Sequence, residues 1–193
     1  MSVAVIGGAA VLLAVERAVY TVIARAPSAF VALCARLAPT VRGGPVAVVA
    51  RLFYAFKALQ AAVFAVWCLV YGHGSLVPEH EGPVALGIAA ALVVAGQILV
   101  LATFYRLGRT GVFFGDRFGY EVRYCREFPF SLLSHPQYVG TMLTIWGVFL
   151  ALRFPHADWY VLPAVETVYY AAATWLESPR RAAQGLRKRI VPM

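Results

Sequence analysis

Long apolar runs set the first limit on what this chain can fold into. They cover residues 3–24, 52–72, 84–105, 139–152 and 159–176, and only the fourth is much shorter than a bilayer requires. A helix needs about 20 predominantly apolar residues to cross the hydrocarbon core. Because 61% of the residues are hydrophobic and 13% are charged, the composition excludes an ordinary soluble domain. The sequence predicts an all-α, polytopic integral membrane helical bundle with four to five membrane-embedded helices.

The length of 193 residues predicts one membrane domain over residues 1–193, with its functional half at about 94–180. Two arrangements are open for the short fourth run. It could pair with the fifth run as a hairpin through residues 153–158, or lie partly in the membrane interface. The connector before the second run predicts a short interfacial helix at 28–37, where apolar residues recur at helical spacing.

The arginines are unevenly distributed along the chain. Segment 25–51 carries four, segment 106–127 carries five and the tail after residue 179 is basic, whereas the formal charges of segment 72–83 are two glutamates. Basic loops lie preferentially on the cytosolic side of a membrane. Five crossings with the N-terminus outside satisfy this distribution, and we expect the first helix to be retained rather than removed as a signal peptide.

The same distribution argues against other classes of partner. The net charge is +8, but the arginines are scattered over loops beside apolar segments, so we expect no nucleic-acid binding. Cys34, Cys68 and Cys125 are odd in number and lack paired spacing. This pattern favours neither a disulfide framework nor a metal site, and we predict no metal. The sequence does not indicate an oligomeric state.

A polar stretch at residues 106–140 is the first place to look for chemistry, because a long loop held against a membrane is seldom a simple connector. Within it, Pro136 opens a helix, and His135 or Ser134 could cap that helix. A histidine before a proline is more often a cap than a catalyst. The free N–H groups at this helix start could also receive an anion.

Ionisable residues inside the apolar runs need a reason to be there. Glu166 and Glu177 are eleven residues apart and therefore share a helix face. Glu166 is either functional or a structural partner of Tyr138 or an arginine. We expect Arg17 and Lys57 to be structural, with side chains that extend toward the membrane interface.

The order and spacing of several motifs resemble the phospholipid methyltransferase family. The matching segments are LGRTGVFFGDRFG (107–119), FPFSLLSHPQYVGT (128–141), WG (146–147), ETVYY (166–170), LESP (176–179) and, loosely, YTVIAR (20–25). The resemblance implies an N-methyltransferase that uses S-adenosylmethionine on phosphatidylethanolamine-type membrane lipids to make phosphatidylcholine. It also implies an endoplasmic reticulum membrane, with a bacterial inner membrane as the alternative.

The resemblance assigns candidate site residues as well. The cofactor-binding set is Val94, Ala95, Gly96, Gly108, Gly111, His135, Glu177 and Ser178. Glu177 would bind the amino group of the methionine moiety. The animal enzyme's Gly-x-Gly is Val94-Ala95-Gly96 here, and its terminal Glu-Glu pair is Glu177-Ser178. The second change resembles the plant-type enzymes, which implies a preference for mono- and dimethylated lipids.

Chemistry narrows the remaining roles only in part. Methyl transfer to an amine requires a proton acceptor, and His135, Tyr138 and Glu166 are the catalytic candidates. Arginines of 106–126 or the helix start after His135 would hold a carboxylate or the lipid phosphate. Aromatic faces of Tyr120, Tyr138 and Trp146 would accept a sulfonium or ammonium. Two alternatives remain, an isoprenylcysteine carboxyl methyltransferase, which shares the HPxYxG core, and a non-enzymatic membrane scaffold or transporter.

Overall fold

A computed structural model describes residues 3–37, 41–75, 82–122 and 125–187, with side chains as far as residue 176. Its elements are helices, joined by turns. They are α1 (Val3–Arg25), α2 (Pro27–Leu37), α3 (Gly44–Tyr71), α4 (Pro83–Val112), the 3-10 helix η1 (Gly115–Phe118), α5 (Pro136–Arg153) and α6 (Val161–Arg187). The prediction of an all-α membrane bundle is confirmed. By length and composition, three of the described helices could cross a membrane: α1, α3 and the helix that begins at Pro83.

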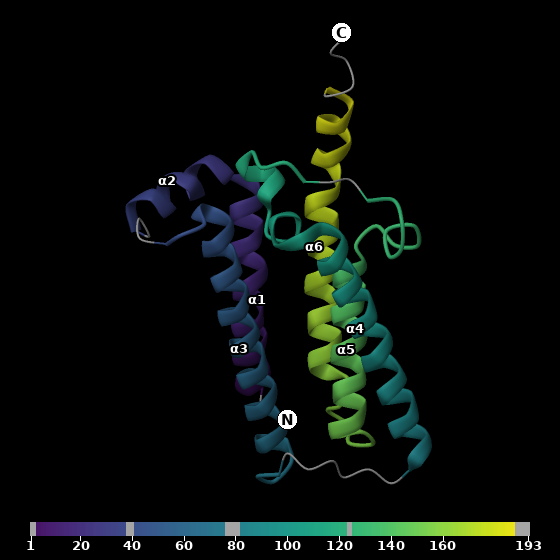
Figure 1. The fold of residues 1–193 in the computed structure, drawn as a ribbon. Helices are drawn as coiled ribbons and strands as arrows, with labels where there is room; N and C mark the ends of the chain where they lie inside the picture. Colours follow the sequence, from purple (N-terminus) through teal and green to yellow (C-terminus); the bar gives the residue numbers. More distant parts are fainter. Residues whose placement is uncertain (1–2, 38–40, 76–81, 123–124, 188–193) are drawn as a thin grey trace.

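The five long helices run alternately up and down, so that connections gather at two ends (Figure 1). α2, η1 and the segment before α5 lie at one end with the end of α1. The ends of α3 and α5 lie at the other. α1 packs against both α3 and α6, while α5 packs against both α4 and α6. The spatial order is therefore α3, α1, α6, α5, α4, which differs from the order along the chain.

Prolines in the first turn fix where three of the helices begin. Pro45 follows the start of α3, Pro83 starts α4 and Pro136 starts α5. A proline costs nothing there because its missing N–H would have no helical partner. These starts make α3 and α5 longer than the apolar runs predicted. α4 also continues beyond residue 105, with a kink at Gly108, whose φ of 62° favours glycine.

α4 and α5 approach closely through glycines on both helices. A Cβ atom added at Gly96 would collide with the carbonyl oxygen of Gly140, and one added at Gly147 would lie 2.7 Å from the carbonyl oxygen of Ala89. Small residues let helix backbones pack closely where lipid surrounds a bundle. This contact holds the C-terminal half of the protein together.

The turn between α5 and α6 is tied to α3 by a set of bonds that we call the Arg153 clamp: Arg153, Asp158, Trp67 and the carbonyl of Tyr71. Arg153 donates to both carboxylate oxygens of Asp158, at 2.9 and 2.8 Å, and to the carbonyl of Tyr71 at 2.8 Å. Trp67 donates to the same carboxylate at 3.0 Å. α5 and α6 thus form a hairpin, which is one of the two arrangements left open for the fourth apolar run, and the clamp fixes it to α3.

The clamp also sets the protonation of its acid. Burial by itself would raise the pKa of Asp158, but the hydrogen bonds from Arg153 and Trp67, with the charge of Arg153, outweigh burial and hold that pKa below its ordinary value. Asp158 therefore stays ionised at neutral pH.

Candidate functional site

A cavity opens between the helices on the side of the bundle where α2 and η1 lie. Its polar lining comes from six different parts of the chain. These residues are Glu16, Arg17 and Tyr20 of α1, Lys57 of α3, Thr103 of α4, Asp116 of η1, and Ser134, His135, Gln137, Tyr138, Thr141 and Tyr170 around α5 and α6. Phenylalanines at 53, 113, 114 and 130 complete the wall. The cavity therefore combines charged and hydroxyl-bearing side chains with aromatic rings.

Arg17 lies among tyrosine rings rather than in solvent. Its guanidinium carbon is 3.9 Å from the ring centre of Tyr170, 5.5 Å from Tyr138 and 5.7 Å from Tyr20. Its side chain is only 11% exposed, and Nη2 donates to Glu16 at 3.0 Å. Rings within about 6 Å of a cation attract it through their faces. The expectation that Arg17 extends toward the interface is wrong, because these rings and Glu16 hold it inside.

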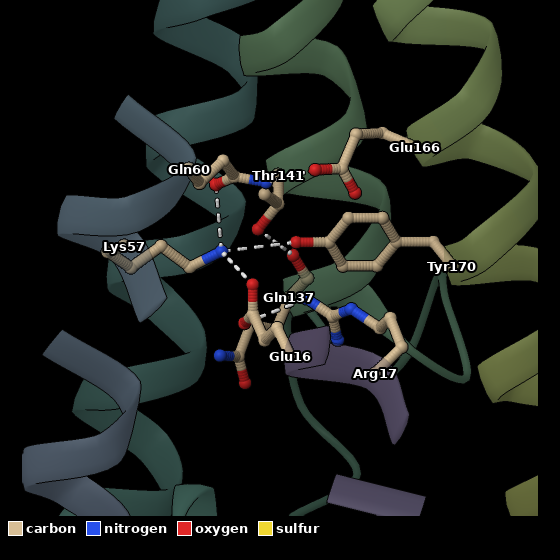
Figure 2. Close-up of polar contacts among 8 residues, drawn as sticks. All are labelled: Glu16, Arg17, Lys57, Gln60, Gln137, Thr141, Glu166 and Tyr170. Carbon is tan, nitrogen blue, oxygen red and sulfur yellow. Dashed lines mark hydrogen bonds and ion pairs between the residues drawn. The ribbon is translucent and has the colours of Figure 1, made fainter. Parts of the chain in front are cut away.

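Lys57 reaches from α3 toward α1 and α6 (Figure 2). Its ammonium lies 3.3 Å from a carboxylate oxygen of Glu16, 3.0 Å from the amide oxygen of Gln60 and 3.4 Å from the hydroxyl of Tyr170. Three acceptors match the three donors of an ammonium. Lys57 is thus a hub that links three helices, so the interface role expected for it is also wrong.

Glu166 lies behind the cavity wall. It is 2% exposed, does not line the cavity, and accepts a hydrogen bond from the side-chain amide of Gln60. The sequence predicted Tyr138 or an arginine as its structural partner, whereas its hydrogen bond comes from this amide. Glu166, Tyr170 and Ala173 are all buried on α6. The predicted face shared by Glu166 and Glu177 stays a prediction, because the side chain of Glu177 lies outside the described part of α6.

The histidine and tyrosine of the predicted HPxY motif both line the cavity at the start of α5. The His135 ring stacks on Tyr138, with centres 5.7 Å apart and planes 11° apart, and Tyr138 meets the ring of Tyr170 edge-on at 5.4 Å. His135 occupies the N-cap position, but its side chain makes no capping hydrogen bond. His135 therefore does not cap the helix through its side chain, and it lines the cavity instead.

The remaining cofactor candidates do not gather in one place. Gly111 lines the cavity, while Gly108 is exposed at the kink of α4. Val94 and Ala95 are exposed along α4, and Gly96 is buried against α5; these three do not line the cavity. The side chains of Glu177 and Ser178 lie outside the described part of α6. The structure therefore brings together only Gly111 and His135 from this set, and the cofactor role of the others stays a prediction.

Several groups predicted for ligand contact lie elsewhere. Trp146 donates to the hydroxyl of Thr167 and packs against Trp159, and Tyr120 is 46% exposed; neither lines the cavity. Arg106 pairs with Glu127 at 2.6 Å outside the cavity. Among the described residues, the one arginine that lines the cavity is Arg17. Sequence reasoning missed it because it gave the first two helices a packing role, although an ionisable residue inside an apolar run is itself a functional signal.

Comparison with known proteins places this site in a family. The family model described as "Phospholipid methyltransferase" matches residues 84–182, just over half of the chain. The chain belongs to this family. The match contains the HPxY motif and α6, whereas Arg17, Tyr20 and Lys57 lie in the part of this phospholipid methyltransferase family member that precedes it.

Individual relatives agree with the family model. The chain is 36% identical over 91 residues to a phosphatidyl-N-methylethanolamine N-methyltransferase of Saccharomyces cerevisiae, covering 47% of this chain and 44% of the relative. It is 36% identical over 110 residues to the phosphatidylethanolamine N-methyltransferase of Rattus norvegicus, covering 53% and 54%. It is 37% identical over 54 residues to a phosphatidyl-N-methylethanolamine N-methyltransferase of Arabidopsis thaliana, covering 28% and 33%. The chain thus spans about half or less of the curated relatives it matches, and no solved structure matches it.

Proposed function

We propose that this protein is an S-adenosylmethionine-dependent N-methyltransferase that acts on phosphatidylethanolamine-type lipids, preferring the mono- and dimethylated forms, and yields phosphatidylcholine. The observation that carries the proposal is the tyrosine-walled cavity of a phospholipid methyltransferase family member, with His135 and Tyr138 in it. We propose the endoplasmic reticulum membrane as its location, as the family resemblance implies.

The chemistry of the cavity fits a cationic methyl donor and a cationic amine product. Tyr138 and Tyr170 already hold a guanidinium against their faces. A sulfonium or an alkylammonium is attracted by the same ring quadrupole, with roughly 0.5–2 kcal/mol per contact. When bound, S-adenosylmethionine supplies an electrophilic methyl group. Gly111 and His135 would line its site, and Glu177 would hold its amino group.

His135 and Tyr138 are the groups best placed to move the proton that the lipid amine must lose. Each has a titratable atom, the imidazole nitrogen or the phenol oxygen, in a residue that lines the cavity. The amine attacks only as the neutral base, so an acceptor within hydrogen-bond reach lowers the barrier. Phe113, Phe114 and Phe130 line the same cavity and would exclude water from the reacting groups.

The lining also supports the proposed preference among lipids. Each added methyl removes a donor hydrogen from the headgroup amine and enlarges its apolar surface, so a methylated amine depends more on aromatic faces than on acceptors. Three tyrosines line the cavity, whereas its acids are already paired: Glu16 with Arg17 and Lys57, and Asp116 with Arg117. Initial rates on the three lipids in one detergent test this, and faster use of the unmethylated lipid would contradict it.

Product analysis with methyl-labelled S-adenosylmethionine tests the proposed activity. We expect label in a phospholipid headgroup. Label in a protein methyl ester would instead indicate an isoprenylcysteine carboxyl methyltransferase, and no labelled product would favour a scaffold or transporter.

The assignment of Glu177 has its own test. Glu177→Ala should abolish cofactor binding without unfolding the protein, whereas Ser178→Ala should cost much less, because serine offers no charge to an ammonium. Near-normal affinity of Glu177→Ala for S-adenosylmethionine would contradict the role.

A further inference from the structure

Two residues that line the cavity each carry a buried polar atom without a hydrogen-bond partner in the described part of the chain. Among the described residues, the buried side-chain atoms without a hydrogen bond are Arg17 Nε, Tyr20 OH and Tyr71 OH. Arg17 and Tyr20 line the cavity, and Tyr71 does not. Tyr20 is 7% exposed. A buried donor without an acceptor destabilises the protein, so such a group in a cavity indicates a ligand that supplies the acceptor.

The geometry of Arg17 shows which chemistry that ligand must have. The face of the guanidinium lies on Tyr170, and Nη2 is bonded to Glu16, which leaves Nε at the edge. A guanidinium has donors and no acceptor and is always charged. Tyr20 follows three residues later on α1 and therefore lies on the same face. A charged donor and a hydroxyl donor on one helix face suit an oxyanion.

The acids that share the cavity do not prevent an anion from binding. Glu16 is held by Arg17 and by Lys57 at 3.0 and 3.3 Å. Asp116 lies 3.8 Å from Arg117. Each carboxylate is therefore paired with a cation, and Nε of Arg17 has no hydrogen bond and can donate to a ligand.

We propose that Arg17 and Tyr20 form an oxyanion site on α1, which takes either the phosphodiester of the lipid headgroup or the carboxylate of the methyl donor. The identity of the ligand rests on the proposed function. Arg17 and Tyr20 both precede residues 84–182, which match the family model. The first helix of this chain therefore adds an anion-binding part to a cavity whose other residues include His135 and Tyr138.

Tyr20→Phe isolates the site, because it removes one hydroxyl and keeps the ring. The purified full chain is titrated separately with a short-chain phosphatidyl-N-methylethanolamine and with S-adenosylmethionine. We expect the affinity for one of the two to fall about tenfold, while the Tm of the ligand-free protein stays the same or rises, since an unpaired buried hydroxyl is lost. Loss for the lipid identifies the phosphodiester, and loss for the methyl donor identifies the carboxylate.

Tyr71→Phe is the matched control, because it removes another buried, unpartnered hydroxyl that does not line the cavity. Its affinities should equal those of the unmodified protein. Arg17→Lys is a second variant, which keeps the charge but removes Nε and should weaken the same ligand as Tyr20→Phe. Unchanged affinities in Tyr20→Phe, an equal loss in Tyr71→Phe, or no binding of either ligand to the unmodified protein would overturn the site.

Activity separates this inference from the proposed function. If the unmodified protein methylates lipid while Tyr20→Phe binds both ligands normally, the oxyanion site is wrong and the function stands. If no methyl is transferred but Tyr20→Phe loses affinity for the phospholipid, the site stands and the function is wrong.

Discussion

Two buried ionic networks in the described part of the protein differ in how completely their polar atoms are hydrogen-bonded. In the Arg153 clamp, one arginine donates to both oxygens of Asp158 and to a backbone carbonyl, and Trp67 donates to the same acid. At the cavity, Arg17 has an acidic neighbour and tyrosine faces, but its Nε has no partner. A network closed by the protein contributes to folding. A network with an unbonded donor can bind a ligand that supplies the acceptor. In the ligand-free protein, that unbonded donor lowers the free energy of unfolding.

Breaking the clamp should have the largest effect on stability. Asp158→Ala leaves Arg153, whose side chain is 4% exposed, buried without its carboxylate. Removing one partner of a buried ion pair costs about 3–5 kcal/mol. We expect a large fall in Tm, measured by intrinsic fluorescence in detergent, with methylation lost only as unfolding proceeds. A normal Tm would show that the clamp is dispensable. Trp67→Phe removes one hydrogen bond of the same network, and its cost should be nearer 1 kcal/mol.

The cavity should respond in the opposite way, through rate rather than stability. His135→Ala and Tyr138→Phe should each lower the methylation rate at least tenfold, or about 1.4 kcal/mol of barrier. The Tm should change little, because both side chains border the cavity and Tyr138→Phe keeps the ring that packs against Tyr170. The measurement pairs initial rates with thermal unfolding on the same preparations. Parallel losses of rate and Tm would instead favour a packing role.

A smaller effect is expected at Glu166, which belongs to neither the clamp nor the cavity lining. Its carboxylate accepts from Gln60 and does not line the cavity. Glu166→Gln keeps an acceptor oxygen of the same shape, so turnover should fall by less than about threefold. A loss of two orders of magnitude would restore Glu166 as the proton acceptor and would contradict its placement behind the wall.

Acid should act on the clamp only well below neutral pH. The folded-state pKa of Asp158 is lowered from its ordinary value of 3.8, so the native state binds fewer protons than the unfolded state. The stability that Asp158 contributes is present above pH 3.8 and is lost as pH falls through the lowered pKa. Between pH 5 and 8, Asp158 should therefore cause no change in Tm. Comparing the Tm difference between the unmodified protein and Asp158→Asn across pH checks this, and a difference that fell between pH 8 and 5 would contradict it.

Much of the architecture was readable from the sequence. Apolar length predicted the helices, because a backbone in lipid must satisfy its hydrogen bonds within each segment. Apolar residues at helical spacing predicted the short helix at 28–37, and Pro136 predicted a helix start beside His135. These are properties of residues close together in the chain, and local geometry is enough to decide them.

Only the tertiary structure could decide which distant residues meet. Lys57 bonds to Glu16 across 41 residues and to Tyr170 across 113. Those contacts depend on α1 packing between α3 and α6. Hydropathy does not predict which helices are neighbours, because a helix face is as apolar against lipid as against another helix. The sequence by itself determined that helices form and that one of them begins at Pro136. Packing decided that Arg17 of α1, rather than an arginine of 106–126, lines the cavity. A buried cation is stable only beside acids and aromatic faces, and the fold brings Glu16 and Tyr170 to Arg17.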